Sequence, residues 1–192
     1  RALILCPTRE LATQIHERLT TYGRHLPLKH VVVYGGVPQG RQVTGLRNGA
    51  DVLVATPGRL IDLVAQGHAD LRQVEHLVLD EADRMLDMGF IVDIRRVIGL
   101  IPAERQTLFF SATVSRDIRR LAASILDDPV QIDTAPESST VESIQQDVYM
   151  LERKQRHLLL RSLLMNDGVG RTLVFTRTKY GADKLAKVLW RS

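Results

Sequence analysis

Short apolar runs alternate with amphipathic stretches of helical period over the first 133 residues. The apolar runs predict strands at residues 2–6, 31–34, 51–55, 76–79 and 107–110. Between them, the spacing of apolar side chains predicts helices at 39–47, 58–65 and 91–100, one helix that Thr8 caps and one that Ser115 caps. Strands that alternate with helices in this way predict βαβ units and a mostly parallel α/β sheet.

The pattern changes after residue 133. Residues 134–146 are polar, contain Pro136 and have no long apolar run, so they predict a linker. A strand at 147–151, a helix at 153–164, a strand at 171–176 and a helix at 180–190 then predict the start of a second α/β unit. Because the sequence begins at Arg1 without an initiator Met and directly before a predicted strand, we expect it to be a fragment.

The composition is typical of a globular protein, since 44% of the 192 residues are hydrophobic and 25% are charged. No stretch approaches the roughly 18 apolar residues that a membrane span requires, and there is no signal peptide. We therefore expect no membrane contact and, from the missing signals alone, a cytoplasmic location. Cys6 is the only cysteine, which excludes an internal disulfide and leaves no cysteine-based spacing for a metal site.

The net charge of +4 is unevenly distributed. Residues 1–133 contain 16 Lys and Arg against 16 Asp and Glu, whereas residues 134–192 contain 10 against 6, so the whole excess lies in the second part. A basic surface suits a polyanion such as nucleic acid, although this excess is modest. Aromatic residues form only 5% of the chain and are not interleaved with basic ones, which does not favour a base-stacking platform.

Three acids, Asp80, Glu81 and Asp83, follow the apolar run at 76–79. In a parallel α/β sheet, ligands bind at the carboxyl ends of the strands. Carboxylates this close together repel each other unless a cation or a basic partner compensates them. Mg²⁺ that carries a nucleotide phosphate is typically held by one or two carboxylates. The alternative is a solvated acidic turn that opens a helix, where acids favour the helix dipole.

Other distinctive segments also lie just after predicted strands. They are Pro7-Thr8-Arg9-Glu10-Leu11-Ala12, Gly35-Gly36, Thr56-Pro57-Gly58-Arg59 and Ser111-Ala112-Thr113. Each alone has a structural explanation, such as a helix cap or a turn. Together with residues 80–83, they predict that hydroxyls, glycines, arginines and acids converge on one edge of the sheet.

With these segments, the chain resembles the DEAD-box family of ATP-dependent RNA helicases. PTRELA, GG, TPGR, DEAD and SAT stand unaltered, and residues 173–179 look like motif IV of the family's second domain. The resemblance implies two RecA-like domains that close on ATP and single-stranded RNA. It implies a helicase ATP-binding domain at 1–133 without its N-terminal part, a linker at 134–146, and the truncated start of a helicase C-terminal domain at 147–192.

The resemblance also implies roles for the acids and hydroxyls. Asp80 would hold Mg²⁺, and Glu81 would orient and deprotonate the attacking water, both next to ATP. Asp83 would bond to the hydroxyls of Ser111 and Thr113 and so link the nucleotide state to domain closure. The alternative role for Ser111 and Thr113 is helix capping.

On the RNA side, the resemblance implies contacts to sugar and phosphate, which carry no sequence information. The residues that would make them are Thr8, Arg9, Gly35, Gly36, Thr56 and Arg59 in the first domain, and Thr178 and Lys179 in the second. Binding of single-stranded or duplex RNA should then weaken with added salt and depend little on sequence. The sequence does not indicate which proteins, if any, bind this chain.

The glycine-rich loop that ends in Gly-Lys-Thr/Ser and cradles phosphates is not in this sequence. Nor are the family's late motifs, whose arginines reach the γ-phosphate, and an arginine finger is typically worth about 10³- to 10⁵-fold in turnover. We therefore expect the parent protein to be an RNA-dependent ATPase and helicase, and the fragment alone to have negligible activity. The alternatives are a non-catalytic RNA-binding or regulatory module derived from such a motor, and a DNA-directed relative, which would show a different acidic tetrad.

Overall fold

In the computed structural model, the described residues are 1–134, 145, 147–152, 154–166 and 169–190. The chain divides into two compact units, Arg1–Glu137 and Ser138–Ser192, and each is described by itself. The predicted linker at 134–146 lies outside the described residues except for Thr134 and Gln145. The boundary between the two units falls inside this segment.

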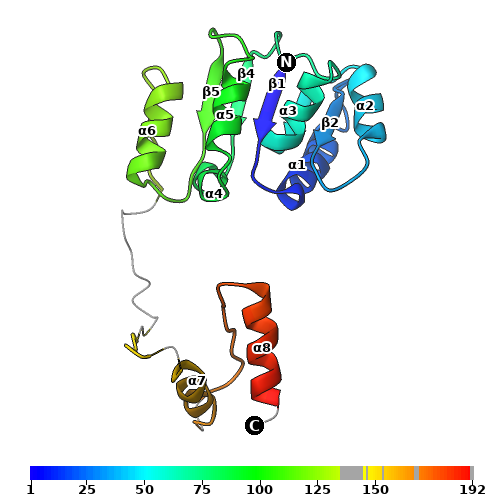
Figure 1. Cartoon of the computed structure of the whole chain (residues 1–192). Coiled ribbons are helices and arrows are strands. Elements are labelled where there is room, and N and C mark those ends of the chain that lie inside the picture. The colour runs from blue at the N-terminus through cyan, green and yellow to red at the C-terminus, as the bar shows by residue number, and fades with distance from the viewer. Residues whose placement is uncertain (135–144, 146, 153, 167–168, 191–192) are drawn as a thin grey trace. The chain divides into compact units, whose positions relative to one another are not determined.

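The first unit is built on a sheet of five parallel strands (Figure 1). They are β1 (Ala2–Leu5), β2 (His30–Val33), β3 (Val52–Ala55), β4 (His76–Leu79) and β5 (Gln106–Phe109). Their order across the sheet is β2-β3-β1-β4-β5, so β1 lies at the centre. The predicted parallel α/β sheet is confirmed, and each predicted strand boundary lies within one residue of the observed one.

The helices of this unit are α1 (Arg9–Tyr22), α2 (Gly40–Arg47), α3 (Pro57–Ala65), α4 (Ala82–Asp87), α5 (Ile91–Ile98) and α6 (Arg116–Ile125). Both predicted caps are confirmed, because Thr8 accepts a hydrogen bond from the Leu11 N–H at 3.2 Å and Ser115 accepts one from the Ile118 N–H at 3.3 Å. Such a cap typically stabilises a helix by about 1 kcal/mol. The acids after β4 open α4, as the acidic-turn alternative expected, but they are half-buried and not fully solvated.

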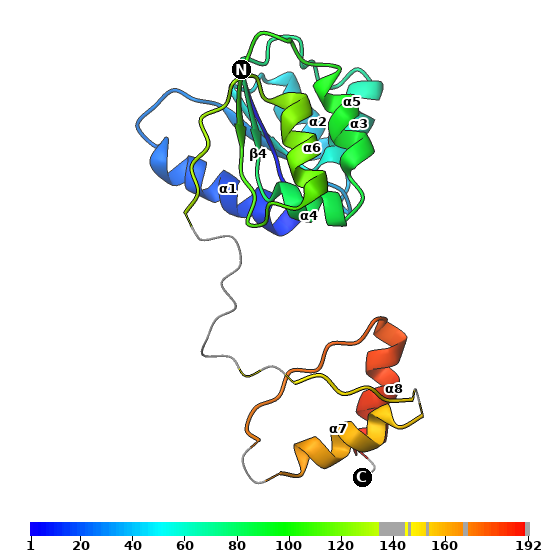
Figure 2. The same cartoon turned by 90° about the vertical axis from the view of Figure 1, so that its left-hand side faces the viewer.

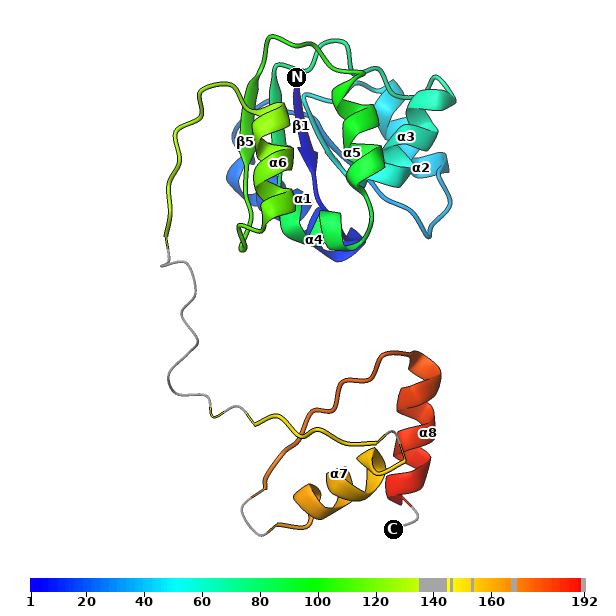
Figure 3. The same ribbon diagram turned by 60° about the vertical axis from the view of Figure 1, so that its left-hand side comes forward.

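The two faces of the sheet are covered by different helices (Figure 2). Leu3 and Leu77 point to one face, where they are fully buried in a core that includes side chains of α3, α5 and α6. Figure 3 shows α5 and α6 lying across this face. Cys6 and Val54 point to the other face, where they pack against Ala12 of α1. Burial on both faces makes the sheet a rigid platform for the segments that follow its strands.

All five strands end in register. Leu5 pairs with Ala55 and Leu79, Val33 pairs with Ala55, and Leu79 pairs with Phe109. The segments that follow these residues therefore start along one line, which we call the carboxyl edge. Because neighbouring strands lie about 4.8 Å apart, this edge measures about 19 Å from β2 to β5.

The second unit contains α7 (Arg156–Leu164) and α8 (Lys179–Trp190), which confirms both predicted helices. The predicted strands at 147–151 and 171–176 are wrong, because the described residues there form no strand. A buried parallel strand needs partners along its edges and cover on both faces, whereas Met150 and Phe175 are 92% and 86% exposed. Of the helices in the described part of the chain, none is long and apolar enough to cross a membrane.

Candidate functional site

The strand order sorts the distinctive segments into two groups that the sequence mixes. Along the carboxyl edge, residues 35–36 follow β2, 56–59 follow β3, 7–12 follow β1, 80–83 follow β4 and 111–113 follow β5. We call the first three segments the arginine half of the edge and the last two the acidic half. The predicted convergence on one edge is confirmed, and the two halves meet where β1 lies beside β4.

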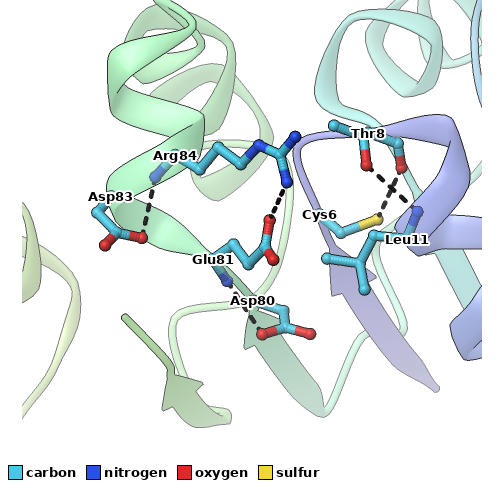
Figure 4. Close-up of polar contacts among 7 residues, drawn as sticks. All are labelled: Cys6, Thr8, Leu11, Asp80, Glu81, Asp83 and Arg84. Atoms are coloured by element: carbon cyan, nitrogen blue, oxygen red, sulfur yellow. Dashed lines mark hydrogen bonds and ion pairs between the residues drawn. The ribbon is translucent and has the colours of Figure 1, made fainter. Parts of the chain in front are cut away.

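Asp80 is the first residue after β4 and is half-buried. Its Oδ1 accepts a hydrogen bond from the Glu81 N–H at 3.0 Å (Figure 4). Burial is the main cause that raises the pKa of Asp80 above its ordinary value; the Glu81 hydrogen bond opposes this effect, and the Glu81 charge adds to it. A half-buried carboxylate beside a second carboxylate is a place where a bound cation would relieve repulsion.

Glu81 has a left-handed backbone, with φ 50° and ψ 52°, which is uncommon for a residue other than glycine. Its Oε2 forms an ion pair with Arg84 Nη1 at 3.0 Å, and Figure 4 shows the side chain turned toward Arg84 and away from Asp80. The Glu81 side chain is still 40% exposed. Backbone strain of this kind concentrates at functional sites, and here it separates two neighbouring carboxylates.

Asp83 links the ends of β4 and β5. Its Oδ2 accepts hydrogen bonds from the Thr113 N–H at 2.9 Å and the Thr113 hydroxyl at 2.8 Å, and its Oδ1 accepts one from the Arg84 N–H. Partial burial alone would raise the pKa of Asp83, but the bonds from Thr113 and Arg84 together lower it. The Ser111 hydroxyl donates to the Thr113 carbonyl at 2.7 Å instead. The expected Asp83–Thr113 bond is therefore present, whereas the expected bond from Ser111 to Asp83 is not.

Cys6 is the first residue after β1 and lies near the acids that follow β4 (Figure 4). Its thiol is buried and lies 3.7 Å from the carbonyl oxygens of Thr8 and Ala55. Burial, followed by the negative charges of Asp80 and Glu81, raises the pKa of the Cys6 thiol to about 12. A thiol held neutral in this way is a poor nucleophile, so Cys6 serves as a small packing residue beneath the site.

Thr8 and Arg9 begin α1 at the centre of the edge. The Thr8 hydroxyl caps the helix, and Arg9 Nε pairs with Glu10 Oε1 at 3.0 Å. The pKa of Glu10 is lowered, first by its own backbone N–H and then by Arg9. The Arg9 side chain is 56% exposed. Since exposed ion pairs are typically worth about 0–1 kcal/mol, an anion could displace Glu10 from Arg9 at little cost.

Arg59 does not point freely into solvent. Its Nη1 and Nη2 both donate to the Val37 carbonyl, at 3.2 and 3.1 Å, so it is tied to the loop that contains Gly35 and Gly36. Thr56 is only 8% exposed, which leaves little of it available to a ligand. The arginine half therefore combines one accessible cation, Arg9, with a glycine loop that Arg59 holds.

Motif reasoning missed two residues of the site, Arg84 and Gln42. Arg84 lies three residues after Glu81, and this i,i+3 spacing at a helix start is the signal that could have indicated the ion pair. Gln42 is 8% exposed and donates from Nε2 to the Tyr34 carbonyl at 3.0 Å. The sequence feature that could have indicated Gln42 is its position one turn before Leu46, which places a polar residue on the apolar face of α2.

Thr178 and Lys179 lie in the second unit, at the start of α8. The Thr178 hydroxyl accepts a hydrogen bond from the Gly181 N–H at 3.0 Å, as a helix cap does. A cavity of ≈ 1170 Å³ in the same unit has Thr178 in its lining. Its basic lining residues include Lys154, Arg156, Arg177 and Lys184. The RNA contacts expected of Thr178 and Lys179 stay predictions.

The acidic half fits a cation that arrives with a nucleotide. Among the described residues, no group of three or more His, Cys, Asp or Glu could hold a metal ion. Mg²⁺ does not require such a group, since one or two carboxylates, waters and phosphate oxygens usually hold it. Asp80 meets this requirement, because only its Oδ1 has a hydrogen-bond partner among the described residues.

The chain is similar to known proteins along almost its whole length. Residues 1–121 match the model of a family described as DEAD/DEAH box helicase. The DEAD-box ATP-dependent RNA helicase 20 of Oryza sativa subsp. japonica is 43% identical over 190 residues, which are 97% of this chain and 38% of the rice protein. The chain spans less than half the length of the curated relatives it matches.

Two solved structures share its fold. A crystal structure of a DEAD box protein from Methanococcus jannaschii is 34% identical and covers 100% of this chain and 51% of that chain, with a TM-score of 0.66. A crystal structure of a hypothetical ATP-dependent RNA helicase from Sulfolobus tokodaii is 41% identical and covers 66% of this chain and 38% of that chain, with a TM-score of 0.62. These similarities and the five-stranded parallel sheet confirm the expected RecA-like α/β fold.

Proposed function

The chain belongs to the DEAD/DEAH box helicase family, and on this premise we propose that the protein that carries it is an RNA-dependent ATPase. It couples ATP binding and hydrolysis to RNA binding and local unwinding of duplexes. One observation carries the proposal: the acids after β4 and the arginine half after β1, β3 and β2 lie along one sheet edge. Neighbouring strands are about 4.8 Å apart, so a nucleotide and an RNA backbone bound to the two halves would be close enough to influence each other.

Within the acidic half, Asp80 would hold the Mg²⁺ that accompanies ATP. When bound there, the ion would neutralise negative charge on the phosphate oxygens. Glu81 would orient the attacking water and accept its proton, for which its carboxylate must lie within hydrogen-bond reach of that water. The Glu81–Arg84 pair does not prevent this, because its side chains are 40% and 56% exposed, and such pairs are weak.

Asp83 would connect hydrolysis to movement. It holds Thr113 through two hydrogen bonds, and Ser111 is bonded to the Thr113 carbonyl. A displacement of the acids by a nucleotide would therefore shift residues 111–113 as one piece. On this proposal, residues 1–133 belong to the ATP-binding domain, and residues 147–192 begin the C-terminal domain that closes on it.

The arginine half would bind the sugar-phosphate backbone of single-stranded or duplex RNA. Thr8, Arg9 and the amides of Gly35 and Gly36 provide the donors, and Thr56 and Arg59 lie beside them. Such donors recognise phosphate and ribose without reading bases. From the second unit, Thr178 and Lys179 would contact the same backbone. The affinity should therefore fall with salt, by a slope of about 0.7 per neutralised phosphate on a single strand.

The proposal is tested by ATP hydrolysis in the protein that contains this sequence, with and without single-stranded RNA. Glu81→Gln removes the proton acceptor and preserves the size of the side chain. We expect hydrolysis to fall by about 10²- to 10⁴-fold, while ATP binding measured with a fluorescent nucleotide persists. Glu104→Gln, an exposed position in the loop before β5, is the matched control and should hydrolyse ATP normally.

Two outcomes would contradict the proposal in different ways. Normal hydrolysis by the Glu81→Gln variant would remove Glu81 from its role. An absence of ATP hydrolysis in the wild-type protein at every RNA concentration, with RNA binding preserved, would favour a non-catalytic RNA-binding module.

A further inference from the structure

The loop after β2 is anchored at two of its carbonyl groups. Gln42 Nε2 donates to the Tyr34 carbonyl at 3.0 Å, and Arg59 donates from Nη1 and Nη2 to the Val37 carbonyl at 3.2 and 3.1 Å. Gly35 and Gly36 lie between these two anchors. Because Gln42 belongs to α2 and Arg59 to α3, the loop is fixed to two separate elements.

Both anchors are costly arrangements of polar groups. Gln42 is 8% exposed, and its Oε1 is buried without a hydrogen-bond partner among the described residues. Arg59 is half-buried and places two donors on one neutral carbonyl. A buried unpaired acceptor destabilises a fold, and departures of this kind concentrate at functional sites. The anchors therefore indicate that the position of the loop matters for more than stability.

The amides between the anchors are unused. Within the described part of the chain, the N–H groups of Gly35 and Gly36 donate to no acceptor. Gly36 has a φ of 78°, which favours glycine, and no heavy atom lies within 4 Å of the position that a Cβ would take at either residue. A ligand can approach this backbone closely, and phosphate oxygens accept hydrogen bonds from such amides.

We propose that Arg59 is a positioning residue for RNA. By holding the Val37 carbonyl, it keeps the amides of Gly35 and Gly36 available to an RNA phosphate, and its guanidinium does not itself neutralise a phosphate. This inference rests on the proposed RNA-binding function. It replaces the sequence-based expectation that Arg59 grips phosphate oxygens directly.

A direct phosphate contact by Arg59 and a positioning role of Arg59 predict different salt dependences of RNA binding. A cationic side chain that neutralises a phosphate on a single strand adds about 0.7 to the slope of log affinity against log salt. Backbone amides release no counterions, so loss of their contacts weakens binding without changing that slope. Lysine also separates the roles, because it supplies the charge but lacks the planar fork that reaches one carbonyl with two donors.

The experiment measures the affinity for single-stranded RNA at several KCl concentrations, using the protein that contains this sequence. The variants are Arg59→Lys, Arg59→Gln, Gly36→Ala and the Arg59→Gln/Gly36→Ala double variant. Arg18→Gln, an exposed arginine toward the far end of α1, is the control for loss of one positive charge away from the carboxyl edge. A thermal melt of each variant reports whether the fold is retained.

We expect Arg59→Lys and Arg59→Gln each to weaken RNA binding about tenfold. The slope of log affinity against log salt should stay the same as in the wild-type protein. Gly36→Ala should weaken binding to a similar extent, because alanine is strained at this φ. The double variant should have an RNA affinity only slightly lower than that of the weaker-binding single variant, since both changes disturb one loop.

Three results would overturn the inference. In the first, Arg59→Lys binds normally and Arg59→Gln lowers the slope by about 0.7, as a direct phosphate contact requires. In the second, both variants melt earlier but bind RNA normally when folded, as a purely structural role requires. In the third, the wild-type protein does not bind RNA, which refutes the proposed function itself and not only the role of Arg59.

Discussion

The two units of this chain show opposite degrees of burial. In the first unit, the hydrophobic core extends from Leu3 to Leu121 and includes residues that are fully buried. In the second unit, neither α7 nor α8 contains a buried residue among those described, and Trp190 is 93% exposed. Both units nevertheless alternate apolar runs with amphipathic segments in the sequence.

The difference shows which parts of the pattern act locally. A helix satisfies its hydrogen bonds within its own segment, so α7 and α8 form without a sheet to pack on. A strand depends on neighbours that are distant in sequence. The central β1 has them on both sides, in β3 and β4, whereas the described residues of 147–151 and 171–176 have none. A functional edge therefore exists only where a sheet has formed.

Removing one apolar side chain from each unit tests the difference in burial between the two units. Leu77→Ala empties a fully buried position in β4, and we expect it to lower the free energy of unfolding by about 2–5 kcal/mol. Phe175→Ala changes a side chain that is 86% exposed, and we expect a shift within about 0.5 kcal/mol. Chemical denaturation followed by circular dichroism measures both. Equal losses would show that the second unit has a core of its own.

A smaller effect should distinguish long-range from local hydrogen bonds. Asp83→Asn weakens the link to Thr113, 30 residues away, and we expect a loss of about 1 kcal/mol after discounting for exposure. The pKa of Asp83 is lowered in the folded state. The ionised carboxylate therefore stabilises the fold above the ordinary aspartate pKa, and this contribution is lost as the pH falls through the folded-state pKa. The wild-type and variant proteins should therefore converge in acid.

Thr178→Ala is the counterpart in the second unit. It removes a hydrogen bond to Gly181, three residues away, and should lower only the helix content of α8. Denaturant melts at neutral and acidic pH measure the stability of both variants.

A constant difference in stability between the wild-type and Asp83→Asn proteins at every pH would contradict the role given to the Asp83 charge.

The charge of Asp80 should affect stability with the opposite sign to that of Asp83. The pKa of Asp80 is raised, mainly by burial, so its ionised form opposes folding, and stability declines as the pH rises from the ordinary aspartate pKa through the folded-state pKa. We expect Asp80→Asn to raise stability at neutral pH by a few tenths of a kcal/mol, up to about 1, while ATP hydrolysis is lost. Asp183→Asn, at an exposed position in α8, should change neither quantity. A destabilised Asp80→Asn protein would contradict this assignment.

The sequence was most informative where a segment determines its own structure. The caps at Thr8 and Ser115 were predicted correctly, and so were the helices that follow them, because an N-cap needs only residues a few positions away. The five strands of the first unit were also predicted, since apolar runs between helices leave few other arrangements.

What the sequence did not predict depends on contacts between distant residues. Nothing in TPGR or GG indicates that Arg59 binds the Val37 carbonyl, 22 residues away. The Ser111 hydroxyl donates to the Thr113 carbonyl, two residues further along the chain, and not to Asp83. The division of the carboxyl edge into an acidic and an arginine half follows from the strand order, which the sequence does not state.

RNA affinity can show whether the acidic half and the arginine half of the carboxyl edge are separate sites. Single-stranded RNA binding, without nucleotide, should be measured in parallel for the Arg9→Gln and Glu81→Gln variants of the protein that contains this sequence. We predict that Arg9→Gln weakens binding and lowers the salt slope by about 0.7, whereas Glu81→Gln stays within about twofold of the wild-type affinity. If Glu81→Gln reduced RNA binding as much as Arg9→Gln does, the two halves of the carboxyl edge would not be separate sites.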